Sequence, residues 1–525
     1  MHRRALTAAL ASATVALGGA LAVTTVPSQA ADPVSPLVLE APDRVVARSH
    51  HGWVYSDLGV QMVAQGEDFR IEATRAASGG GVDEWWDPSY NSPITATWKR
   101  EAGDVPLGEL SSWSGLDDFA SIRVFDADGE RIRTVRADGC FNGEANRVGP
   151  NGPASNPFPW GCPWNPFTLG SVMGVAQDYS SSLLPEWGTN LRLKPGIYEM
   201  VATISPTWRD TFGIAEGDAT VTSKLVVKDA RRRFRSSDTI DAARGTDHLE
   251  AVGEEPTRTS AGALADANAP DLRALPAFDV RINEKGTAMR FGATVWNGGA
   301  GPMVIEGFRE DHEHDDEAPT GDHTDHMTAY QYYFDGNGNQ TGFDEVGQFG
   351  YHAANHNHWH FEDFARYRLF AADPANQDQP GELAVKSTKA SFCLVATDAV
   401  DLTVPNPDMR PEYTDLGSQC GGRNAESLRE VLANGHGDTY HQFRAGQAFR
   451  IGNVPDGKYF ISVEANPADE PGAENDGRNL KELDLTNNDS LRKVRIWTTP
   501  KGVRKVKAYQ VGMIEEYGFE EFRTR

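Results

Sequence analysis

The chain has 525 residues, of which 39% are hydrophobic and 24% charged, as in ordinary soluble globular proteins. This length suits two or three domains, each large enough for a core of its own. The formal net charge of −25 disfavours nucleic acid as a partner and would attract cations such as amines, although a charged surface can also serve solubility alone.

The first 30 residues have the pattern of a secretory signal peptide. Arg3 and Arg4 precede an apolar run rich in Ala, Leu, Val and Gly, and small residues follow at Ser28 and Ala30. A transmembrane anchor is the alternative, but the chain has no second apolar run long enough to cross a bilayer. We therefore expect a secreted, extracellular protein that has no membrane partner once residues 1–30 are removed.

Two β-rich regions are predicted, which makes the expected fold class all-β. Residues 31–229 contain short alternating segments separated by Gly, Pro, Asn and Asp, a pattern typical of a β-sandwich. Residues 230–268 contain few large apolar side chains and are predicted to be a linker. A second β-sandwich-like domain is expected over residues 269–500, followed by a charged tail over residues 501–525.

A short internal similarity supports this tandem arrangement. Residues 193–206 resemble residues 454–467. Each stretch has a turn that contains Pro and Gly, followed by a predicted strand with a Tyr near its start. Turns of this kind are common in sandwiches, so the similarity indicates two β domains without showing common ancestry.

The four cysteines fall into two pairs along the sequence. This clustering favours Cys140–Cys162 and Cys393–Cys420, one bridge in each domain, although four cysteines allow three connectivities. An oxidising extracellular compartment permits both bridges.

The densest cluster of metal-binding residue types is an alternating triplet, His356, His358 and His360. Alternation places the three side chains on one face of a strand. In a straight strand the outer two would lie about 13 Å apart, so we expect a bend or bulge that lets the imidazoles converge. Nitrogen ligands with open positions suit copper or zinc, and an oxidising compartment without thiolate ligands favours copper.

Several segments, taken in order, resemble the lysyl oxidase family. They are His356-Asn-His-Trp-His-Phe-Glu-Asp-Phe364, then Lys389-Ala-Ser-Phe-Cys-Leu394, then Asp438-Thr-Tyr440, and finally the turn Thr486-Asn-Asn488. The resemblance covers about residues 270–497, whereas the first 230 residues carry no such resemblance. One departure is Asn355, which stands where animal members carry a cysteine.

The resemblance implies a copper-dependent amine oxidase whose catalytic domain is the C-terminal one. His356, His358 and His360 would hold copper, and Lys389 and Tyr440 would combine into the cofactor lysine tyrosylquinone. Such an enzyme uses dioxygen to oxidise primary amines, including lysine side chains of proteins or peptides. The products would be an aldehyde, ammonia and hydrogen peroxide.

Lys389 is expected to lie on a strand over residues 389–394. Alternation would put it on the face opposite the apolar side chains, pointing toward a cavity, whereas a solvated surface lysine is the usual alternative. Cofactor formation needs the neutral amine, so its pKa must fall from about 10.4, which burial or nearby copper would favour.

A general base is also needed to remove a proton from the substrate. Asp438 would share a strand face with Tyr440 if residues 435–441 are extended, which makes Asp438 the first candidate. Glu362 and Asp363, which follow the histidine triplet, are the alternatives.

A second ion site is predicted in the turn at residues 482–488. Carboxylate and amide oxygens are the ligands that calcium prefers, and four such side chains gather here: Glu482, Asp484, Asn487 and Asn488. In related lysyl oxidases this turn pairs with a Pro-Asp-Leu sequence at the start of the domain. Residues 270–272 match it, which adds Asp271 and Leu272 to the predicted site. A turn without an ion is the alternative.

Other functions compete with the oxidase. The acidic stretch at residues 311–317, with His323 and His326, is either a solvated loop or the rim of a metal site. One alternative is a secreted zinc- or copper-binding module without redox activity, in which Lys389 and Tyr440 stay unlinked. Another is a secreted, calcium-stabilised β-sandwich that serves in adhesion or surface binding. An adhesion module needs no histidine triplet and no buried lysine, so those residues argue against it.

Overall fold

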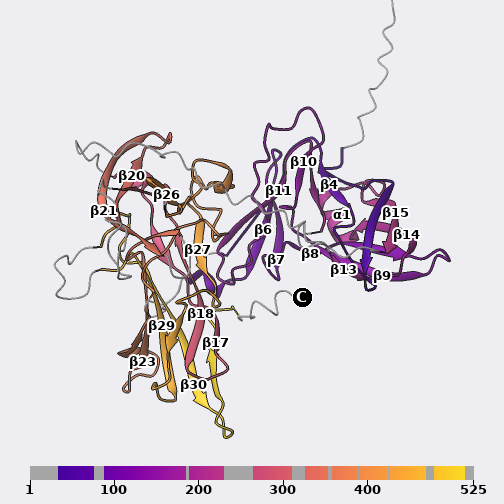
Figure 1. Cartoon of the computed structure of the whole chain (residues 1–525). Coiled ribbons are helices and arrows are strands. Elements are labelled where there is room, and N and C mark those ends of the chain that lie inside the picture. Colours follow the sequence, from indigo (N-terminus) through magenta and orange to yellow (C-terminus); the bar gives the residue numbers. More distant parts are fainter. Residues whose placement is uncertain are drawn as a thin grey trace, which may run out of the picture. The chain divides into compact units, whose positions relative to one another are not determined.

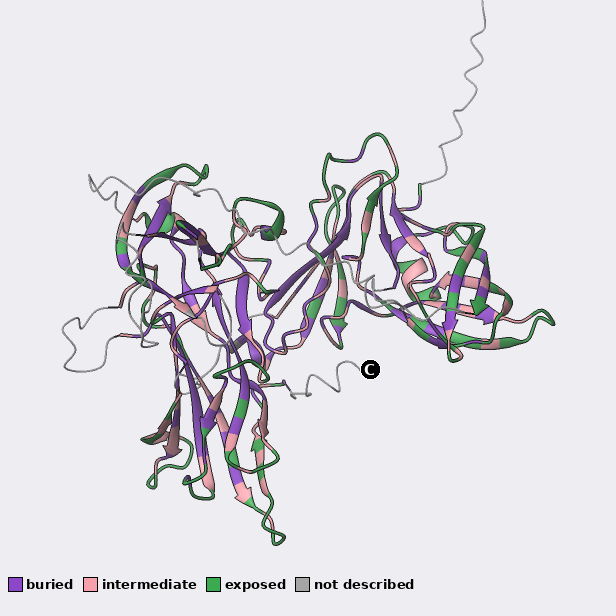
Figure 2. Ribbon diagram, viewed as in Figure 1, coloured by how far each residue is buried: buried purple, intermediate pink, exposed green. Residues whose placement is uncertain are grey.

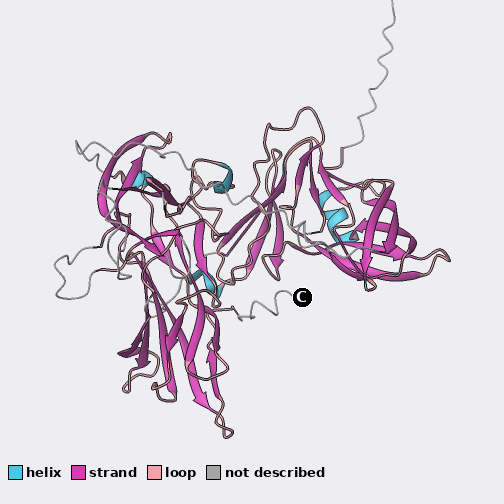
Figure 3. Cartoon of the chain, in the orientation of Figure 1, coloured by secondary structure: helices cyan, strands magenta, loops and turns pink. Residues whose placement is uncertain are grey.

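The computed structural model describes nine stretches of the chain: residues 34–75, 88–184, 189–229, 264–309, 326–352, 358–387, 389–423, 425–468 and 478–514. Figure 3 shows strands nearly everywhere in these stretches and only short helices, so the all-β class is confirmed. Within them, no helix has the length and apolar character needed to cross a membrane. The predicted signal peptide and linker residues 230–263 lie outside the described residues.

Residues 34–229 form three sheets, in which neighbouring strands are antiparallel except for the pair β2–β15. The first sheet contains β1 (Leu37–Glu40), β4 (Gln61–Ala64), β12 (Tyr179–Ser182) and β10 (Ala145–Arg147). The second contains β11 (Gly170–Val175), β5 (Phe69–Arg75), β6 (Ile94–Lys99) and β7 (Val105–Leu110). The third contains β13 (Thr189–Arg192), β3 (Trp53–Ser56), β2 (Arg44–His50), β15 (Thr220–Asp229), β14 (Gly196–Ile204), β8 (Leu116–Phe125) and β9 (Arg131–Gly139). The helical elements are η1 (Pro88–Asn91) and α1 (Pro206–Phe212).

Residues 264–514, the region in which all the predicted site residues fall, form three further sheets (Figure 1). The first contains β16 (Leu272–Ala274), β18 (Ala288–Asn297), β27 (His436–Tyr440) and β25 (Asp398–Ala399), with β17 (Phe278–Ile282) and β28 (Ala448–Arg450) also paired to β18. The second contains β22 (His358–Phe361), β21 (Gln340–His352), β20 (His326–Phe334), β19 (Met303–Arg309) and β26 (Ser427–Leu432). The third contains β24 (Pro380–Lys386), β23 (Ala365–Ala372), β29 (Gly457–Ala465), β30 (Asp489–Thr498) and β31 (Arg504–Ala508). Short 3₁₀ turns occur at η2 (Asp266–Asn268) and η3 (Pro411–Tyr413).

Apolar side chains on alternate strand positions build two large hydrophobic cores. Figure 2 marks buried residues in purple along the strands. In β5, for example, Phe69, Ile71 and Ala73 are buried and the residues between them are partly exposed. One core draws almost all its residues from the region before residue 230, and the other draws its residues from the region after 270. A smaller cluster combines side chains from both regions: Tyr90, Phe167, Leu169, Leu275, Phe278, Trp296, Val400, Val511 and Ile514. The described residues from Ser35 onward accordingly form one compact unit.

The C-terminal sheet extends beyond the boundary predicted at residue 500. β31 pairs with β30 in antiparallel register, and the buried Val511 and Ile514 that follow it join the shared apolar cluster. This part of the predicted tail is ordered because its apolar side chains have a core to enter.

The two similar sequence stretches build the same local structure. Tyr198, near the start of β14, donates its hydroxyl hydrogen bond to the Lys194 carbonyl at 2.8 Å. Tyr459, near the start of β29, does the same to the Pro455 carbonyl at 2.7 Å. In both places a tyrosine fastens its strand to the preceding turn, a device that recurs in β-sandwiches.

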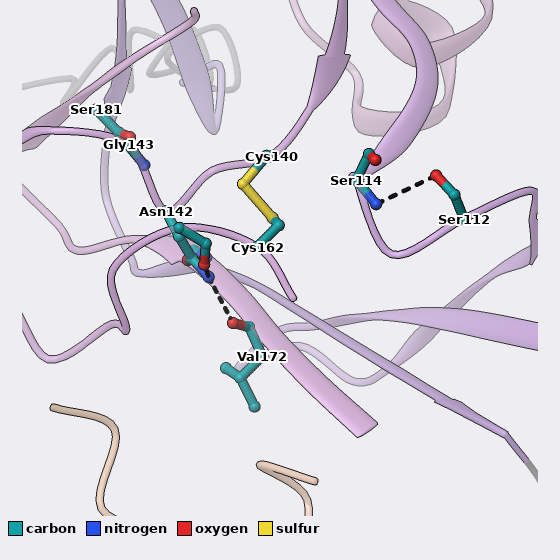
Figure 4. The surroundings of a disulfide bond; sticks show 10 residues. Ser112, Ser114, Cys140, Asn142, Gly143, Cys162, Val172 and Ser181 are labelled. Atoms are coloured by element: carbon teal, nitrogen blue, oxygen red, sulfur yellow. Dashed lines mark hydrogen bonds between the residues drawn. A yellow bond between two sulfur atoms is a disulfide. The ribbon is translucent and has the colours of Figure 1, made fainter. Parts of the chain in front are cut away.

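Both predicted disulfides are confirmed. Cys140 and Cys162 have Cα atoms 6.0 Å apart, and those of Cys393 and Cys420 are 5.8 Å apart. Beside the first bridge, the buried Asn142 donates a hydrogen bond to the Val172 carbonyl at 2.9 Å (Figure 4). That bond fastens the disulfide-linked segment to β11.

Candidate active site

The segment that carries Lys389 is not the strand that alternation predicted. Its only ladder contact among the described residues is an isolated bridge, in which Phe361 and Phe392 exchange backbone hydrogen bonds of 2.7 and 3.0 Å. The Lys389 ammonium does not point away from Phe392 but lies 4.5 Å from the centre of its ring. The prediction that Lys389 and Phe392 occupy opposite faces was therefore wrong, because an irregular backbone does not impose alternation.

Lys389 is nevertheless directed toward Tyr440. Its Nζ lies 4.4 Å from the centre of the Tyr440 ring and donates a hydrogen bond to the Ser391 carbonyl at 3.3 Å. The residue is only 9% exposed. Burial lowers the pKa of the Lys389 ammonium to about 8, and the negative charge of Asp438 opposes this shift. A substantial fraction of Lys389 is therefore the neutral amine near physiological pH.

Tyr440 is held by the strand that the sequence predicted. β27 pairs with β18 so that Tyr440 lies opposite Ala293 and Asp438 opposite Val295, which puts Asp438 and Tyr440 on one face. The Tyr440 hydroxyl donates to the Cys393 carbonyl at 3.1 Å. Burial, followed by the charge of Asp438, raises the pKa of Tyr440 well above its usual value.

Of the three candidate bases, Asp438 is the one that faces the Lys389–Tyr440 pair. It is 4% exposed, and its Oδ2 has no hydrogen-bond partner within the described stretches. Burial raises its pKa well above the ordinary carboxyl value, although the Lys389 charge lowers it. Glu362 instead accepts a hydrogen bond from the Gln348 amide at 2.8 Å, and Asp363 is exposed.

Two of the three predicted copper ligands can be placed. β22 pairs with β21 without a register shift, so His358 and His360 share a face, and their ring centres are 4.9 Å apart. His356 lies outside the described residues, together with the other positions before His358 where the expected bend would fall.

Ser391 connects the histidine strand with the Lys389–Tyr440 pair. Its hydroxyl lies 3.4 Å from Nδ1 of His360, and its carbonyl accepts the hydrogen bond from Lys389. A hydrogen-bonding group on one ring nitrogen is common for histidines that bind a metal through the other. The fold thus brings His360, Lys389 and Tyr440 into one neighbourhood although they come from three segments.

His326, an exposed histidine at the start of β20, lies in the same strand row as His360. The strand register pairs His326 with Gly350, and Gly350 with His360, so the three residues form one row across β20, β21 and β22. Residues in such a row share a face. The Glu362 carboxylate fills the space beside Gly350, because a Cβ added there would meet Glu362 Oε1 at 2.6 Å. The sequence carried no local signal for this row, because it depends on the pairing of β20 with β21.

A different cluster of metal-binding residue types lies nearby, but it is not a metal site. It consists of Cys393, Cys420 and Glu430, whose ligand atoms lie within 4.8 Å of one another. The two sulfur atoms form a disulfide and offer no thiolate. Glu430 accepts a hydrogen bond from the Leu394 amide at 2.8 Å, and its burial raises its pKa well above the usual value.

The turn at residues 482–488 does meet the start of the domain, as the calcium prediction requires. Glu482 Oε2 accepts a hydrogen bond from the Leu272 backbone amide at 2.6 Å. The Asn487 side-chain amide donates to both carboxylate oxygens of Asp271, at 3.0 and 3.2 Å. Asp271 is 1% exposed, and its second oxygen also pairs with Arg273 at 2.6 Å.

Several features of this turn suit a cation. The side-chain oxygens of Asn487 and Asn488 are buried, and neither has a hydrogen-bond partner in the part of the chain described. Burial raises the pKa of Glu482, and the charge of Asp271 adds to the effect. Asp484 is different, because one of its oxygens accepts hydrogen bonds from the Thr486 amide and hydroxyl and closes the turn.

Comparison of the chain with protein-family models and with curated proteins yields no match. The fold defines an all-β protein, and its site geometry and sequence resemblance are the features that point to a function.

Proposed function

We propose that this chain is a secreted copper amine oxidase of the lysyl oxidase type. It would convert a primary amine, dioxygen and water into an aldehyde, ammonia and hydrogen peroxide. The observation that carries the proposal is the buried Lys389 amine, 4.4 Å from the centre of the Tyr440 ring. The substrates we expect are primary amines, above all the lysine side chains of proteins or peptides.

The residues present fit the cofactor that such an enzyme needs. Lys389 and Tyr440 would be joined as lysine tyrosylquinone, and His356, His358 and His360 would hold the copper. When bound, the copper and the quinone supply the oxidising power and pass the electrons of the amine to dioxygen. A pKa of about 8 makes Lys389 a far better nucleophile near neutral pH than a solvated lysine.

The surrounding side chains would move the proton and exclude water. Asp438 would accept the proton from the amine's α-carbon at its Oδ2, and a raised pKa makes it a stronger base than an ordinary carboxylate. Phe392 packs edge-on against both Tyr440, at 5.0 Å between ring centres, and Tyr367, at 5.8 Å. These rings shield the Lys389–Tyr440 pair from water, which lowers the pKa of the Lys389 ammonium.

The direct test uses the copper-loaded protein exposed to oxygen. We expect a coloured phenylhydrazine adduct and a proteolytic fragment in which the Lys389 and Tyr440 peptides are covalently joined. Lys389→Ala and Tyr440→Phe should each abolish the adduct and the release of peroxide from amines, yet bind copper as the parent does. Lys386→Ala, on the exposed surface of β24, is the matched control and should behave as the parent. Retained activity in either site variant would refute the cofactor assignment.

We also propose that the turn at residues 482–488 binds a structural calcium ion together with Asp271 and the Leu272 backbone. An ion would satisfy the buried oxygens of Asn487 and Asn488 and would offset the repulsion between Glu482 and Asp271. A chelator should then lower the melting temperature by about 5 °C, since binding stabilises the folded state. Glu482→Gln should remove this difference. Identical melting with calcium and with chelator would contradict the site.

A further inference from the structure

A side chain from the N-terminal region reaches the strands that carry the proposed site. Asn165 is fully buried, and its amide donates hydrogen bonds to Asp398 Oδ2 at 3.1 Å and to Thr294 Oγ1 at 3.0 Å. Its own oxygen accepts a hydrogen bond from the Phe167 backbone amide at 3.0 Å, which fixes the orientation of the amide. The segment is held in place nearby, where the backbone amides of Leu169 and Gly170 donate to the Val400 carbonyl.

Asp398 lies on the strand next to Asp438. β25 pairs with β27 so that Asp398 is opposite Gly437, and the Asp398 side chain also interacts with the hydroxyls of Thr397 and Thr439. Strand alternation puts Thr439 on the face of β27 opposite Asp438 and Tyr440. The group around Asp398 therefore forms a polar layer directly behind the strand that carries the proposed base.

Both carboxylates are buried, and the charge of Asp398 acts on Asp438. The negative charge of Asp398 raises the pKa of Asp438, while the positive charge of Lys389 lowers it. Burial raises the pKa of Asp398 to about 6, and hydrogen bonds from Thr439, Thr397 and Asn165 oppose that rise. The other titratable groups that interact with Asp438 are Glu430, Tyr440 and Tyr367.

We propose that Asn165 is a positioning residue for the amine oxidase site: its amide keeps Asp398 oriented and charged behind the strand that carries Asp438. This inference depends on the proposed function, and it gives the N-terminal region a part in the chemistry. The amide supplies a hydrogen bond to a buried anion, an interaction that costs more to lose than an exposed one. Asp398 in turn places a negative charge behind the base that accepts the substrate proton.

The sign of the expected effect follows from these contacts. Asn165→Ala removes a donor, so Asp398 holds its proton to higher pH and carries less negative charge. Asp438 then feels less repulsion and ionises at lower pH. The acidic limb of the pH profile for amine oxidation should therefore shift to lower pH by about half a pH unit.

Two further variants make the test specific. Asp398→Asn removes the same charge while keeping the side-chain shape, so it should move the acidic limb in the same direction. The double variant should shift no further than Asp398→Asn alone, since both changes act through one group. Tyr90→Phe is the matched control, because it removes a buried hydrogen bond of 2.9 Å to the Phe167 carbonyl without touching Asp398. It should leave the profile unchanged.

A second readout separates this inference from the proposed function. In the metal-free protein, infrared difference spectra of a pH titration report the protonated carboxyl band that Asp438→Asn removes. That band should disappear at lower pH in Asn165→Ala and in Asp398→Asn than in the parent.

If neither variant moves the band or the pH profile, the inference is overturned while the oxidase stands. If the parent releases no peroxide but the band moves, the oxidase proposal fails and only the coupling between the two carboxylates survives.

Discussion

Lys389 is a lysine that the fold removes from water. It is packed over the rings of Phe392 and Tyr440, and no carboxylate forms an ion pair with it among the described residues. A buried ammonium gives up its proton more readily than a solvated one, which explains a pKa of about 8. The folded protein thereby holds, next to a phenol ring, an amine that loses its proton at lower pH than a solvated lysine does.

The first prediction at this scale concerns the pH dependence of cofactor formation. As pH rises through about 8, the Lys389 ammonium loses its proton, so the rate of quinone formation in copper-loaded protein should rise and then level off. A lysine with an ordinary pKa of about 10.4 would instead give a rate that still climbs above pH 9. The rate is measured by phenylhydrazine trapping after copper is added at each pH. A rate that continues to climb to about pH 10 would show that Lys389 is not desolvated.

The second prediction assigns the base. Asp438→Asn keeps the shape of the side chain but cannot accept a proton, so kcat for amine oxidation should fall by a factor of about 10²–10⁴. Quinone formation should persist, since Lys389 and Tyr440 remain in place. Glu362→Gln is the comparison, because Glu362 is an alternative base and accepts a hydrogen bond from Gln348. The base assignment fails if the Glu362 variant loses activity and the Asp438 variant keeps it.

At the scale of elements, the Cys393–Cys420 bridge joins the two parts of the proposed site. The Cys393 carbonyl accepts the Tyr440 hydroxyl hydrogen bond, and the Cys420 carbonyl accepts the backbone amide of Trp359, which lies between the two described histidines. The irregular Lys389 segment has few ladder hydrogen bonds of its own. A covalent link to a neighbouring segment therefore does much to fix its position.

The third prediction follows from that arrangement. Replacing both Cys393 and Cys420 with serine should lower the free energy of unfolding by about 3 kcal/mol, the size expected for a loop of this length. It should also slow quinone formation, because the Tyr440 anchor loosens. The matched control replaces Cys140 and Cys162, a bridge of similar span whose loss should destabilise by a similar amount without slowing quinone formation. Equal effects of the two double variants on quinone formation would contradict this role.

At the scale of the whole molecule, the N-terminal and C-terminal regions share apolar and polar contacts. The small apolar cluster takes Phe167 and Leu169 from one region and Leu275, Phe278 and Trp296 from the other. Asn165 adds a buried hydrogen bond to Asp398 across the same junction. The N-terminal region is thus part of the structure that supports the site.

The fourth prediction tests this dependence. A chain that starts at residue 264 would expose the apolar side chains that Phe167 and Leu169 cover, so it should melt at a lower temperature and aggregate more readily than the full chain. Thermal unfolding and light scattering of the two chains give the comparison. Equal melting temperatures and equal solubility would show that the shared cluster contributes little.

The sequence alone determined those properties that depend on the order of neighbouring residues along the chain. Alternation broken by turn residues gave the all-β class, and the clustering of cysteines gave both disulfides. The shared face of Asp438 and Tyr440 also followed, because a strand sends every second side chain to the same side. The strand predicted over residues 389–394 failed because that segment has a single bridge to hold it extended.

Only the tertiary structure decided which of these segments meet. Lys389 and Tyr440 are 51 positions apart (440 − 389), and no local pattern requires the amine to lie over the ring. The row that joins His326 to His360 and the reach of Asn165 to Asp398 likewise come from strand pairing and packing between distant segments. The local sequence determines on which face of its strand a side chain lies. The burial of apolar surface and the long-range hydrogen bonds determine which other segment packs against that face.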